Sequence, residues 1–290
     1  MGSREGLRVA LGKGVQTIVF PGTLYHRTAF SSLPDIASAV KEAVEAGARI
    51  VLEFPRIVTV SDRQKVEELW DLVQSSRVHA VEVHDPGSLL AAAERGIEVR
   101  AGYGLNLTNS GAVEQVKAWG AMGACPSLEI SKGNLQDMAG AASLPLEVVV
   151  HGPLCGMISD YCLLAGSMGP DHELGCSMPC EGDSFWLLDK LGQKYPLQCD
   201  DQCRSHIYHP FEISLFTELP WLAERVSSVR LEGDGYSAEL LGQVIDIYQS
   251  ALKNIKVGEW NQELNYNLLL DLFPHGLTKG PWDGPGAKRL

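Results

Sequence analysis

The sequence lacks the features that would direct it into a membrane or out of the cell. No run reaches the roughly eighteen uninterrupted apolar residues that a spanning helix needs, and the first residues have neither the apolar core nor the cleavage site of a signal peptide. We therefore expect no membrane span and a cytoplasmic protein. Thiols in that compartment stay reduced, which argues against a disulfide framework.

Positive charge is also scarce. The 290 residues include 36 acidic and 24 basic side chains, which gives a formal net charge of −12. Binding to a polyanion depends largely on Lys and Arg neutralising phosphates, and no long run of these residues is present. Nucleic acid is therefore disfavoured as a partner, and the acidic balance favours a small aromatic or quinone-like substrate.

Several catalytic and cofactor motifs are missing. There is no H-E-x-x-H metalloprotease motif, no Ser-His-Asp or Cys-His signature and no redox-active C-x-x-C. The segment GYGLNL at 102–107 has two glycines of a dinucleotide-binding fingerprint but not the third at the right offset. These absences give no support to proteolysis, thioredoxin-like chemistry or a dinucleotide cofactor.

Short β-rich runs do alternate with amphipathic helical stretches, at roughly 25 to 30 residues per strand and helix, which is typical of the βα unit of a parallel sheet. The predicted strands are 15–20, 49–54, 79–85, 97–103, 125–130, 146–152 and 228–234. The predicted helices are 33–48, 61–75, 86–96, 110–119, 132–141, 211–225 and 237–255, with Ser32 as the N-cap of the first.

We favour an α/β fold, a (βα) barrel-like domain, over an open doubly wound sheet. A closed barrel needs eight strands, and the pattern supplies seven. We expect one catalytic domain over 1–255, with a cysteine-rich insertion (151–210) after the strand at 146–150. The remainder, 256–290, is expected to be a C-terminal extension that ends in an irregular Gly- and Pro-rich stretch.

Six of the seven cysteines fall within this insertion, with spacings C-x6-C, C-x13-C, C-x3-C, C-x18-C and C-x3-C. They stand among Gly, Ser, Pro, Asp and Gln, a composition that predicts loops and not core. Their numbers are Cys155, Cys162, Cys176, Cys180, Cys199 and Cys203. The seventh, Cys125, opens a predicted strand and is best interpreted as a small core hydrophobe.

A metal centre explains such a group of reduced thiols. The C-x3-C pairs Cys176/Cys180 and Cys199/Cys203 could form a structural zinc site, although zinc would leave Cys155 and Cys162 unexplained. An iron–sulfur cluster also takes four thiolates, with more varied spacings. Spacing alone leaves the two metals near parity.

Four segments of the chain resemble the collagenase-like peptidase family (U32), and in particular its UbiU/UbiV-type iron–sulfur hydroxylase members. They are HGPLC (151–155), SDYC (159–162), GCSMPC (175–180) and VRLEGDGYS (229–237). The runs YPLQC (195–199) and DDQCRSHIY (200–208) also resemble family segments. The likeness covers most of the chain from about residue 7 to 255.

The resemblance implies a barrel-like catalytic domain, a [4Fe-4S] cluster on four cysteines and oxygen-independent hydroxylation of a quinone precursor or an RNA. It also implies a paralogous protein partner in a heterodimer. In one type of family member, the residues matching Cys155, Cys162, Cys176 and Cys199 would bind the cluster. Another would use Cys162, Cys176 and Cys180, with Cys203 as the fourth; Cys162 and Cys176 belong to both.

Family members usually begin with a further strand ahead of the segment that matches residues 7–22 of this chain. We therefore expect the first barrel strand to be missing here. Either the barrel closes otherwise, a partner fills the gap, or the chain starts late.

The active site of a βα barrel lies at the carboxyl ends of its strands. That rule makes His151 and Glu232 the candidate catalytic residues, although a structural role for His151 is equally consistent with the sequence. Other candidates at strand ends or in loops are Glu53, His84, Asp85, Tyr103, His26, Arg27, Asn106 and Asn109. An ordinary loop role is the simpler interpretation of His26, Arg27, Asn106 and Asn109.

Three functions remain open. The first is an iron–sulfur hydroxylase that acts on an aromatic or quinone precursor, as in ubiquinone biosynthesis. The second is a collagenase-like peptidase. The third is a non-catalytic subunit that carries a cluster or a stabilising zinc. Whether it is an enzyme at all is therefore left open, with hydroxylase favoured.

Overall fold

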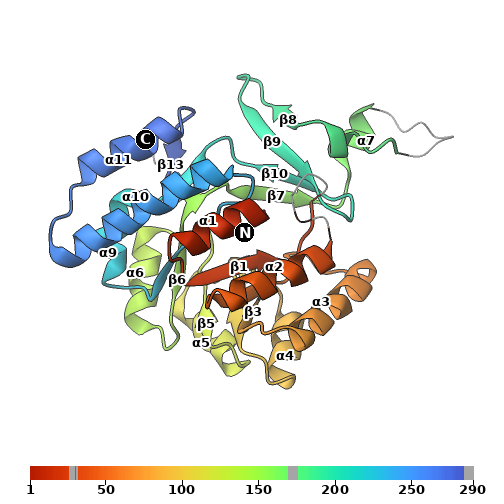
Figure 1. Cartoon of the computed structure of the whole chain (residues 1–290), viewed down its shortest axis with the longest axis horizontal. Helices are drawn as coiled ribbons and strands as arrows, with labels where there is room; N and C mark the ends of the chain where they lie inside the picture. Colours follow the sequence, from red (N-terminus) through yellow and green to blue (C-terminus); the bar gives the residue numbers. More distant parts are fainter. Residues whose placement is uncertain (26–29, 31, 169–175, 284–290) are drawn as a thin grey trace.

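A computed structural model describes residues 1–25, 30, 32–168 and 176–283. Two parts are visible in Figure 1: a parallel sheet wrapped by helices, and an antiparallel sheet that projects from one end of it. The series of parallel strands is β1 (Thr17–Pro21), β2 (Arg49–Glu53), β3 (Ala80–Val83), β4 (Val99–Ala101), β5 (Gly123–Ala124), β6 (Glu147–Gly152) and β12 (Ser228–Leu231). The α/β class with a parallel sheet is confirmed.

The strands of this series follow one another in space as they do in sequence. Strands β1 to β5 form one parallel sheet, and a parallel bridge between Ala124 and Leu146 leads from β5 to the start of β6. Strand β6 then pairs in parallel with β12, with Val148 opposite Val229. Because all these strands run the same way, their carboxyl ends lie at one edge.

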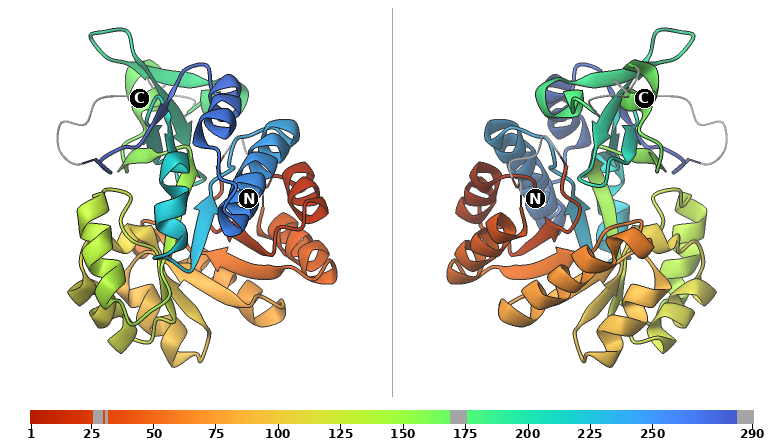
Figure 2. Two further views of the ribbon diagram at one scale, coloured as in Figure 1. Left: turned by 90° about the vertical axis from the view of Figure 1, so that its left-hand side faces the viewer. Right: turned by 90° about the vertical axis from the view of Figure 1, so that its right-hand side faces the viewer.

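Helices cover the outer face of the parallel strands (Figure 2). They are α1 (Arg4–Gly12), α2 (Leu33–Glu45), α3 (Arg63–Ser75), α4 (Pro86–Glu94), α5 (Ser110–Ala118), α6 (Lys132–Ala141) and α10 (Ala238–Val257). The predicted N-cap is confirmed, since the Ser32 side chain accepts a hydrogen bond from the Asp35 backbone N–H. Helix α1 was not predicted. None of the helices in the described ranges is long and apolar enough to cross a bilayer, in agreement with the predicted lack of a membrane span.

The main core lies between the strands and these helices. Strand β3 is buried at every position and β2 at its three central ones, as expected for strands covered on both faces. Ile50 and Leu52 are fully buried, and the Phe54 ring packs 4.3 Å from the Trp70 ring between centroids. This core holds the strand ends in fixed positions.

The cysteine-rich segment forms strands where its composition predicted loops. Its antiparallel sheet has the order β7 (Cys155–Ser159), β10 (Ser205–Tyr208), β9 (Lys194–Cys199) and β8 (Phe185–Leu188). Helices α7 (Leu163–Met168) and α8 (Pro179–Gly182) connect them. The loop prediction is therefore wrong for Cys155 and Cys199: each strand is only four to six residues long, and the surrounding turn residues hide it in the composition.

Two other predictions need correction. The strand predicted at 125–130 is only Gly123–Ala124, because Pro126 has no N–H to donate and the chain turns there. The helix predicted at 211–225 begins as strand β11 (Glu212–Ser214), and only then come the 3-10 turn η3 (Phe216–Glu218) and helix α9 (Leu219–Ala223).

Part of the predicted C-terminal extension packs on the main body. Helix α11 (Gln262–Leu272) lies against α10. Strand β13 (Leu277–Thr278) pairs in parallel with β11, and β11 pairs antiparallel with β6. The described part of 256–290 therefore extends the sheet that contains β12.

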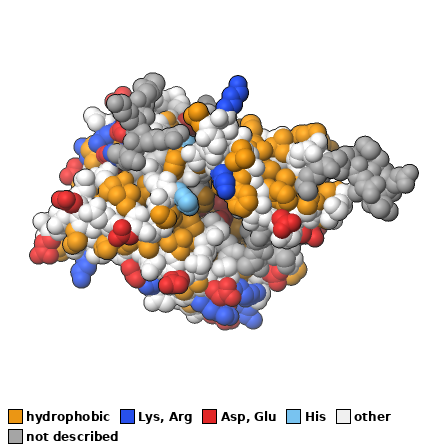
Figure 3. Space-filling model, turned by 90° about the horizontal axis from the view of Figure 1, so that it is seen from above, with side chains coloured by type: hydrophobic (Ala, Val, Ile, Leu, Met, Phe, Trp, Pro, Cys, Tyr) orange, Lys and Arg blue, Asp and Glu red, His pale blue; other side chains and the backbone are white. Residues whose placement is uncertain are grey.

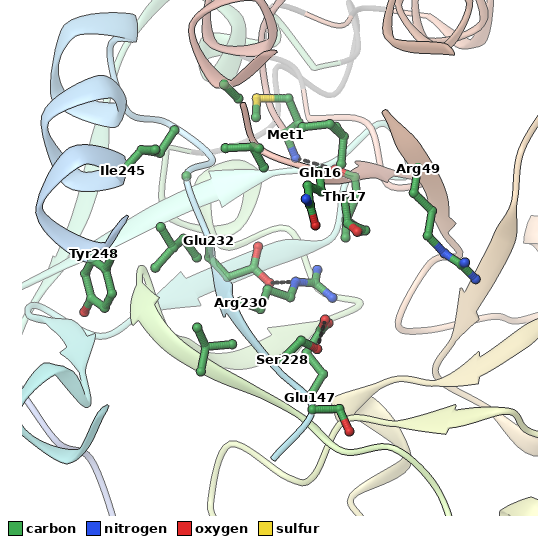
Figure 4. A pocket seen from close by; sticks show the side chains of 18 of the residues that line it. Met1, Gln16, Thr17, Arg49, Glu147, Ser228, Arg230, Glu232, Ile245 and Tyr248 are labelled. Carbon is green, nitrogen blue, oxygen red and sulfur yellow. Dashed lines mark hydrogen bonds and ion pairs between the residues drawn. The ribbon is translucent and has the colours of Figure 1, made fainter. Parts of the chain in front are cut away.

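Within the described residues, no strand pairs with the outer edge of β1 or of β12. A cavity of about 810 Å³ runs between them, which we call the seam cavity. Figure 4 shows Thr17 from β1, Arg230 from β12 and Tyr248 from α10 around it. The Met1 ammonium group reaches its upper end and donates a hydrogen bond to the Val19 carbonyl oxygen, at 2.8 Å.

Candidate active site and metal centre

Arg230 of β12 holds three carboxylates at the carboxyl ends of the strands. Its guanidinium Nη2 lies 2.9 Å from Glu53 Oε2, its Nε lies 2.6 Å from Glu232 Oε1, and its Nη1 pairs with Glu82. Arg230 is 6% exposed and Glu82 1%. We call these four residues the carboxylate cluster. Burying a guanidinium with several carboxylates is tolerable only because each charge has a partner.

His84 fixes the position of Glu53. Its Nδ1 accepts a hydrogen bond from the Gly104 backbone N–H at 3.0 Å, so Nε2 carries the proton and donates to Glu53 Oε1 at 2.8 Å. A Cβ on Gly102 or Gly104 would stand 2.5 or 2.7 Å from the His84 ring. The two glycines of the 102–107 segment therefore make room for this imidazole.

The surroundings separate the pKa values of two of the carboxyl groups. Burial alone would raise the pKa of Glu53, but Arg230 and His84 lower it to about 2. Burial raises the pKa of Glu232 to about 7, and Arg230 only partly opposes this rise. Two neighbouring carboxyl groups with separated pKa values are typical of acid–base sites. Glu232 is the group that can exchange a proton near neutral pH.

A second cavity, of about 80 Å³, opens above the carboxylate cluster, and we call it the mouth cavity. Glu232 lines both it and the seam cavity. Its other walls combine strand-end residues of the parallel sheet with residues of the cysteine-rich sheet, among them Glu53, Arg56, Tyr103, Tyr25, Cys155, His206 and Tyr208. Arg56 Nη1 donates to the Cys155 carbonyl oxygen at 3.3 Å and so ties the two sides together.

A chain of hydrogen bonds leads away from the mouth cavity. Tyr208 donates to the Tyr25 hydroxyl at 3.3 Å, and that hydroxyl lies 3.3 Å from His206 Nδ1. His206 Nε2 lies 3.0 Å from Asp200 Oδ2. The Cys155 sulfur is 4.0 Å from the same His206 Nδ1. Burial raises the pKa of both tyrosines, so both stay protonated and can donate.

Five of the six clustered cysteines lie together at the other end of the cysteine-rich sheet. The Cys199 thiol interacts with those of Cys180 and Cys162, Cys180 also with Cys176, and Cys203 with Cys162 and Cys176. Burial and the neighbouring thiols of Cys180 and Cys162 together raise the pKa of Cys199 to about 12. We call these five residues the thiol cluster.

Backbone amides point at two of these sulfurs. The Ala165 N–H donates to Cys162 Sγ and the Met178 N–H to Cys176 Sγ, both at 3.4 Å. Hydrogen bonds of this kind tune metal-bound thiolates. Met178 has a left-handed backbone, with φ at 50°.

Cys155 stands apart from the thiol cluster. Burial raises the pKa of its thiol, Arg56 lowers it, and its neighbours are Met157 and His206. Cys125 is 2% exposed and packs against Val149 and Ile213, as a small core hydrophobe does. Five of the six candidate ligands therefore belong to the thiol cluster, and which of the six bind a metal stays a prediction.

The two predicted catalytic residues lie in different surroundings. Glu232 belongs to the carboxylate cluster and lines both cavities. His151 is fully buried among the rings of Tyr236, Tyr248 and Phe273, and burial lowers its pKa to about 3. It lies behind the cavity walls, so a catalytic role for His151 stays a prediction.

The other predicted site residues have mixed positions. Glu53, His84 and Tyr103 meet at the carboxylate cluster and the mouth cavity. Asp85 and Asn109 cap helices α4 and α5, and Asn106 accepts a hydrogen bond from Ser127. His26 and Arg27 lie outside the described residues.

Some cavity residues were not singled out from the sequence. Glu82 was absent from our candidates, although a lone carboxylate inside the apolar run AVEV is a signal that could have found it. Tyr25, Arg56, His206 and Tyr208 carry no such local signal, because only the fold brings their segments together.

The fold and these two centres define an α/β protein with a buried carboxylate cluster and a separate group of five thiols. The chain belongs to peptidase family U32, whose family model matches residues 2–288. The resemblance noted in the sequence is thereby confirmed.

Two curated relatives match this chain. One, from Methanocaldococcus jannaschii, is named "Uncharacterized protease MJ0090" and is 26% identical over 80% of this chain and 58% of its own length. The other, from Bacillus subtilis, is named "tRNA hydroxylation protein P1" and is 21% identical over 91% of this chain and 66% of its own. The chain therefore spans less than two thirds of either relative.

Likeness to solved structures is weaker. The U32 peptidase Mk0906 matches with a TM-score of 0.45 and 14% identity over 53% of this chain and 67% of that one. The YdjI aldolase from Escherichia coli K12 matches with a TM-score of 0.39 and 10% identity over 93% of this chain and 86% of that one.

Proposed function

We propose that this protein holds a [4Fe-4S] cluster on Cys162, Cys176, Cys180 and Cys199 and takes part in oxygen-independent hydroxylation of an aromatic or quinone-like compound. The observation that carries the proposal is the meeting of these thiols from separate segments of the cysteine-rich sheet. The name of the Bacillus subtilis relative supports hydroxylation as the reaction class.

The overall spread of the thiol cluster supports an iron–sulfur cluster over zinc, while Cys199 alone interacts directly with Cys180 and Cys162. Four thiolates around a tetrahedral zinc ion at the usual Zn–S length would stand about 3.8 Å apart. Among the residues that the structure describes, no three cysteine sulfurs lie within 4.8 Å of one another. A cubane cluster binds each thiolate to a different iron and so needs them farther apart.

Cys203 is the surplus thiol of the group. It is exposed and has a left-handed backbone, φ 60°, in the turn after β9. Cys199, in contrast, is buried in β9 beside Cys180. We therefore assign the fourth position to Cys199 and leave Cys203 at the rim.

The mouth cavity supplies the acid–base part of the site. When bound, the cluster would supply one-electron chemistry. Glu232 can hold or release a proton at neutral pH, and Arg230 keeps Glu53 ionised beside it. The walls include Tyr25, Tyr103 and Tyr208. A small cavity with aromatic walls and a few charged and polar groups suits an aromatic ring with one or two oxygen substituents.

We further infer that the parallel strands form a βα barrel with one strand position open. The order of β1 to β6 and β12, with the seam cavity between the two free edges, supports this inference. The cysteine-rich sheet then lies at the carboxyl ends of the strands, where βα barrels have their active sites.

Anaerobic purification followed by iron and acid-labile sulfide analysis tests the cluster. We expect close to four of each per chain and a brown protein. Cys155→Ser should leave the iron content unchanged, whereas Cys180→Ser should lower it severalfold. A colourless protein with one zinc and no sulfide would reject the proposal.

RNA as the substrate is the outcome that the Bacillus subtilis relative's name would favour. Incubating the loaded protein anaerobically with an organic oxygen donor such as prephenate and either a quinone precursor or transfer RNA, followed by mass spectrometry of each, separates the two. A hydroxyl group found only on RNA would overturn the aromatic-substrate assignment and leave the cluster assignment intact.

A cysteine-dependent peptidase is the second candidate function. Cys155, His206 and Asp200 place a thiol, an imidazole and a carboxylate in the order that nucleophilic catalysis uses. The raised pKa of the Cys155 thiol weighs against it. Gelatin cleavage that survives cluster loss and disappears in Cys155→Ser would establish it over the hydroxylase.

A further inference from the structure

The edge of the cysteine-rich sheet at β8 has no partner strand in the described part of the chain. The sheet order is β7-β10-β9-β8, so β8 pairs with β9 on one side only. In Figure 1 the β8–β9 hairpin projects from the body of the molecule. Figure 3 views this end from above and shows hydrophobic side chains over much of its surface. An open strand edge is a template for pairing with another chain.

The register shows which backbone groups of β8 face outward. Trp186 lies opposite Pro196 of β9, which has no N–H to donate. The N–H and C=O of Trp186 therefore point away from β9, and those of Leu188, two residues on, do the same. Asp189 confirms the alternation, since its N–H donates inward to the Gln193 carbonyl oxygen at 3.1 Å.

The side chains on this edge are apolar and exposed. Trp186 is 50% exposed and Leu188 66%, and the period of two places them on the same face. Phe185 and Leu187 point to the other face and pack on the small core of the sheet. Strand β8 contains no charged residue and no proline, the usual devices that keep an edge from pairing.

We propose that β8 pairs antiparallel with β8 of a second copy of this chain, about a two-fold axis at Leu187. In an antiparallel pair, the residues whose N–H and C=O groups point toward the partner strand lie opposite one another. Trp186 of each copy therefore lies opposite Leu188 of the other. Each copy thus contributes the same patch, as a two-fold interface requires. The register joins two aromatic–aliphatic pairs on one face.

Charge favours a second copy in this orientation. Glu181 and Asp183 precede the strand, and Lys190 and Lys194 follow it. Antiparallel pairing brings the acidic end of one copy to the basic end of the other, whereas parallel pairing would join like charges. The Asp189 carboxylate is the exception, but it already accepts the Leu191 and Gln193 N–H groups at 2.8 and 2.9 Å.

Sedimentation of the full, anaerobically purified chain over a wide range of concentrations tests the proposal. We expect a monomer–dimer equilibrium with a limiting mass of twice the chain. Leu188→Glu should weaken the dimer by about a hundredfold or more, because it buries a charge beside Trp186 of the other copy. Leu90→Glu, at an exposed leucine of α4, should have no effect.

A charge exchange keeps the test independent of folding defects. Asp183→Lys alone should weaken the dimer several-fold at low salt, and Asp183→Lys with Lys190→Asp should restore it. A protein that is monomeric at every concentration overturns the proposal, and so does a dimer insensitive to Leu188→Glu. Iron analysis of the same sample keeps the two proposals apart: a monomer with its full iron content overturns the β8 pairing and leaves the proposed function intact.

Discussion

The two parts of this molecule are held together by different means. The parallel part has a large apolar core, and its buried charges are paired, as in the carboxylate cluster and the Arg100–Glu147 ion pair at 3.0 Å. Among the described residues of the cysteine-rich sheet, the buried core consists of Leu164, Leu197, Cys199 and Ile207, with thiols at its border.

This difference indicates where each part obtains its stability. A core as small as that of the cysteine-rich sheet rarely supports a fold without disulfides or metal, and the described cysteines are all free. The free energy of metal binding to the thiols would then add to the folding free energy of the cysteine-rich sheet and not to that of the parallel part. The parallel part should stay folded without it.

We expect Cys199→Ser to have the largest effect on the difference in stability between the two parts. Because we propose Cys199 as a buried metal ligand, its loss should remove essentially all hydrogen-exchange protection from β8, β9 and β10. Protection in β2 and β3 should be unchanged. Exchange followed by mass spectrometry on anaerobic protein measures both regions together.

Cys155→Ser is the matched control, since this thiol lies in the same sheet but outside the thiol cluster. It should leave protection in β8 to β10 as in the native chain. Full protection of β9 in Cys199→Ser would show that the sheet is stable without ligation and would break the comparison.

Arg230→Met is the corresponding change in the parallel part. It leaves Glu53, Glu82 and Glu232 buried without their shared cation, which should cost on the order of 3–5 kcal/mol in unfolding free energy. Urea denaturation at neutral pH measures the loss. Arg225→Met, which removes an exposed pair with Glu224, should cost less than about 1 kcal/mol. Equal losses in the two variants would contradict the shared-cation account.

The sequence predicted the parallel part well because its pattern is regular. β-rich runs such as RIVLE and a clear helix cap at Ser32 set the elements locally. The sequence predicts loops for the cysteine-rich sheet because its strands are short and antiparallel. Cys199 is buried by residues that are distant from it in the sequence. Pairing between distant segments is not written in the local pattern.

The candidate site was predictable to the extent that it follows from strand ends. Glu53, His84 and Glu232 each stand at a strand end and were found by that rule. Arg56 and His206 come from a loop and from the second sheet, so their meeting depends on tertiary packing. The isolation of Cys155 from the other thiols was likewise invisible in its C-x6-C spacing.

Glu232→Gln tests the acid–base character of the parallel part. Burial raises the pKa of Glu232 from its ordinary value of 4.5 to about 7. The folded state therefore binds this proton more tightly than the unfolded chain. The resulting stabilisation is full below about pH 4.5 and is lost as the pH rises through 7.

The unfolding free energy of the native chain should fall between about pH 5 and about pH 8. This fall should exceed that of Glu232→Gln by on the order of 2–3 kcal/mol. Urea denaturation of both proteins at the two pH values gives the difference. A constant difference across this range would mean that Glu232 is already ionised at about pH 5 and is not the proton-exchanging group.

The smallest effect concerns the contacts that join the two parts. Arg204 of the cysteine-rich segment pairs with the buried Asp62 at 2.6 Å, while Lys65 of α3 pairs with the partly exposed Asp201 at 2.7 Å. Lys65→Met should cost about 0.5–1 kcal/mol, because a solvent-screened pair contributes little. Arg204→Met leaves a buried carboxylate unpaired and should cost several times more. Thermal unfolding of both variants checks this ranking. Two separate transitions for Lys65→Met and a single one for Arg204→Met would show that the Lys65–Asp201 pair couples the two parts. The role we give to Arg204 would then be wrong.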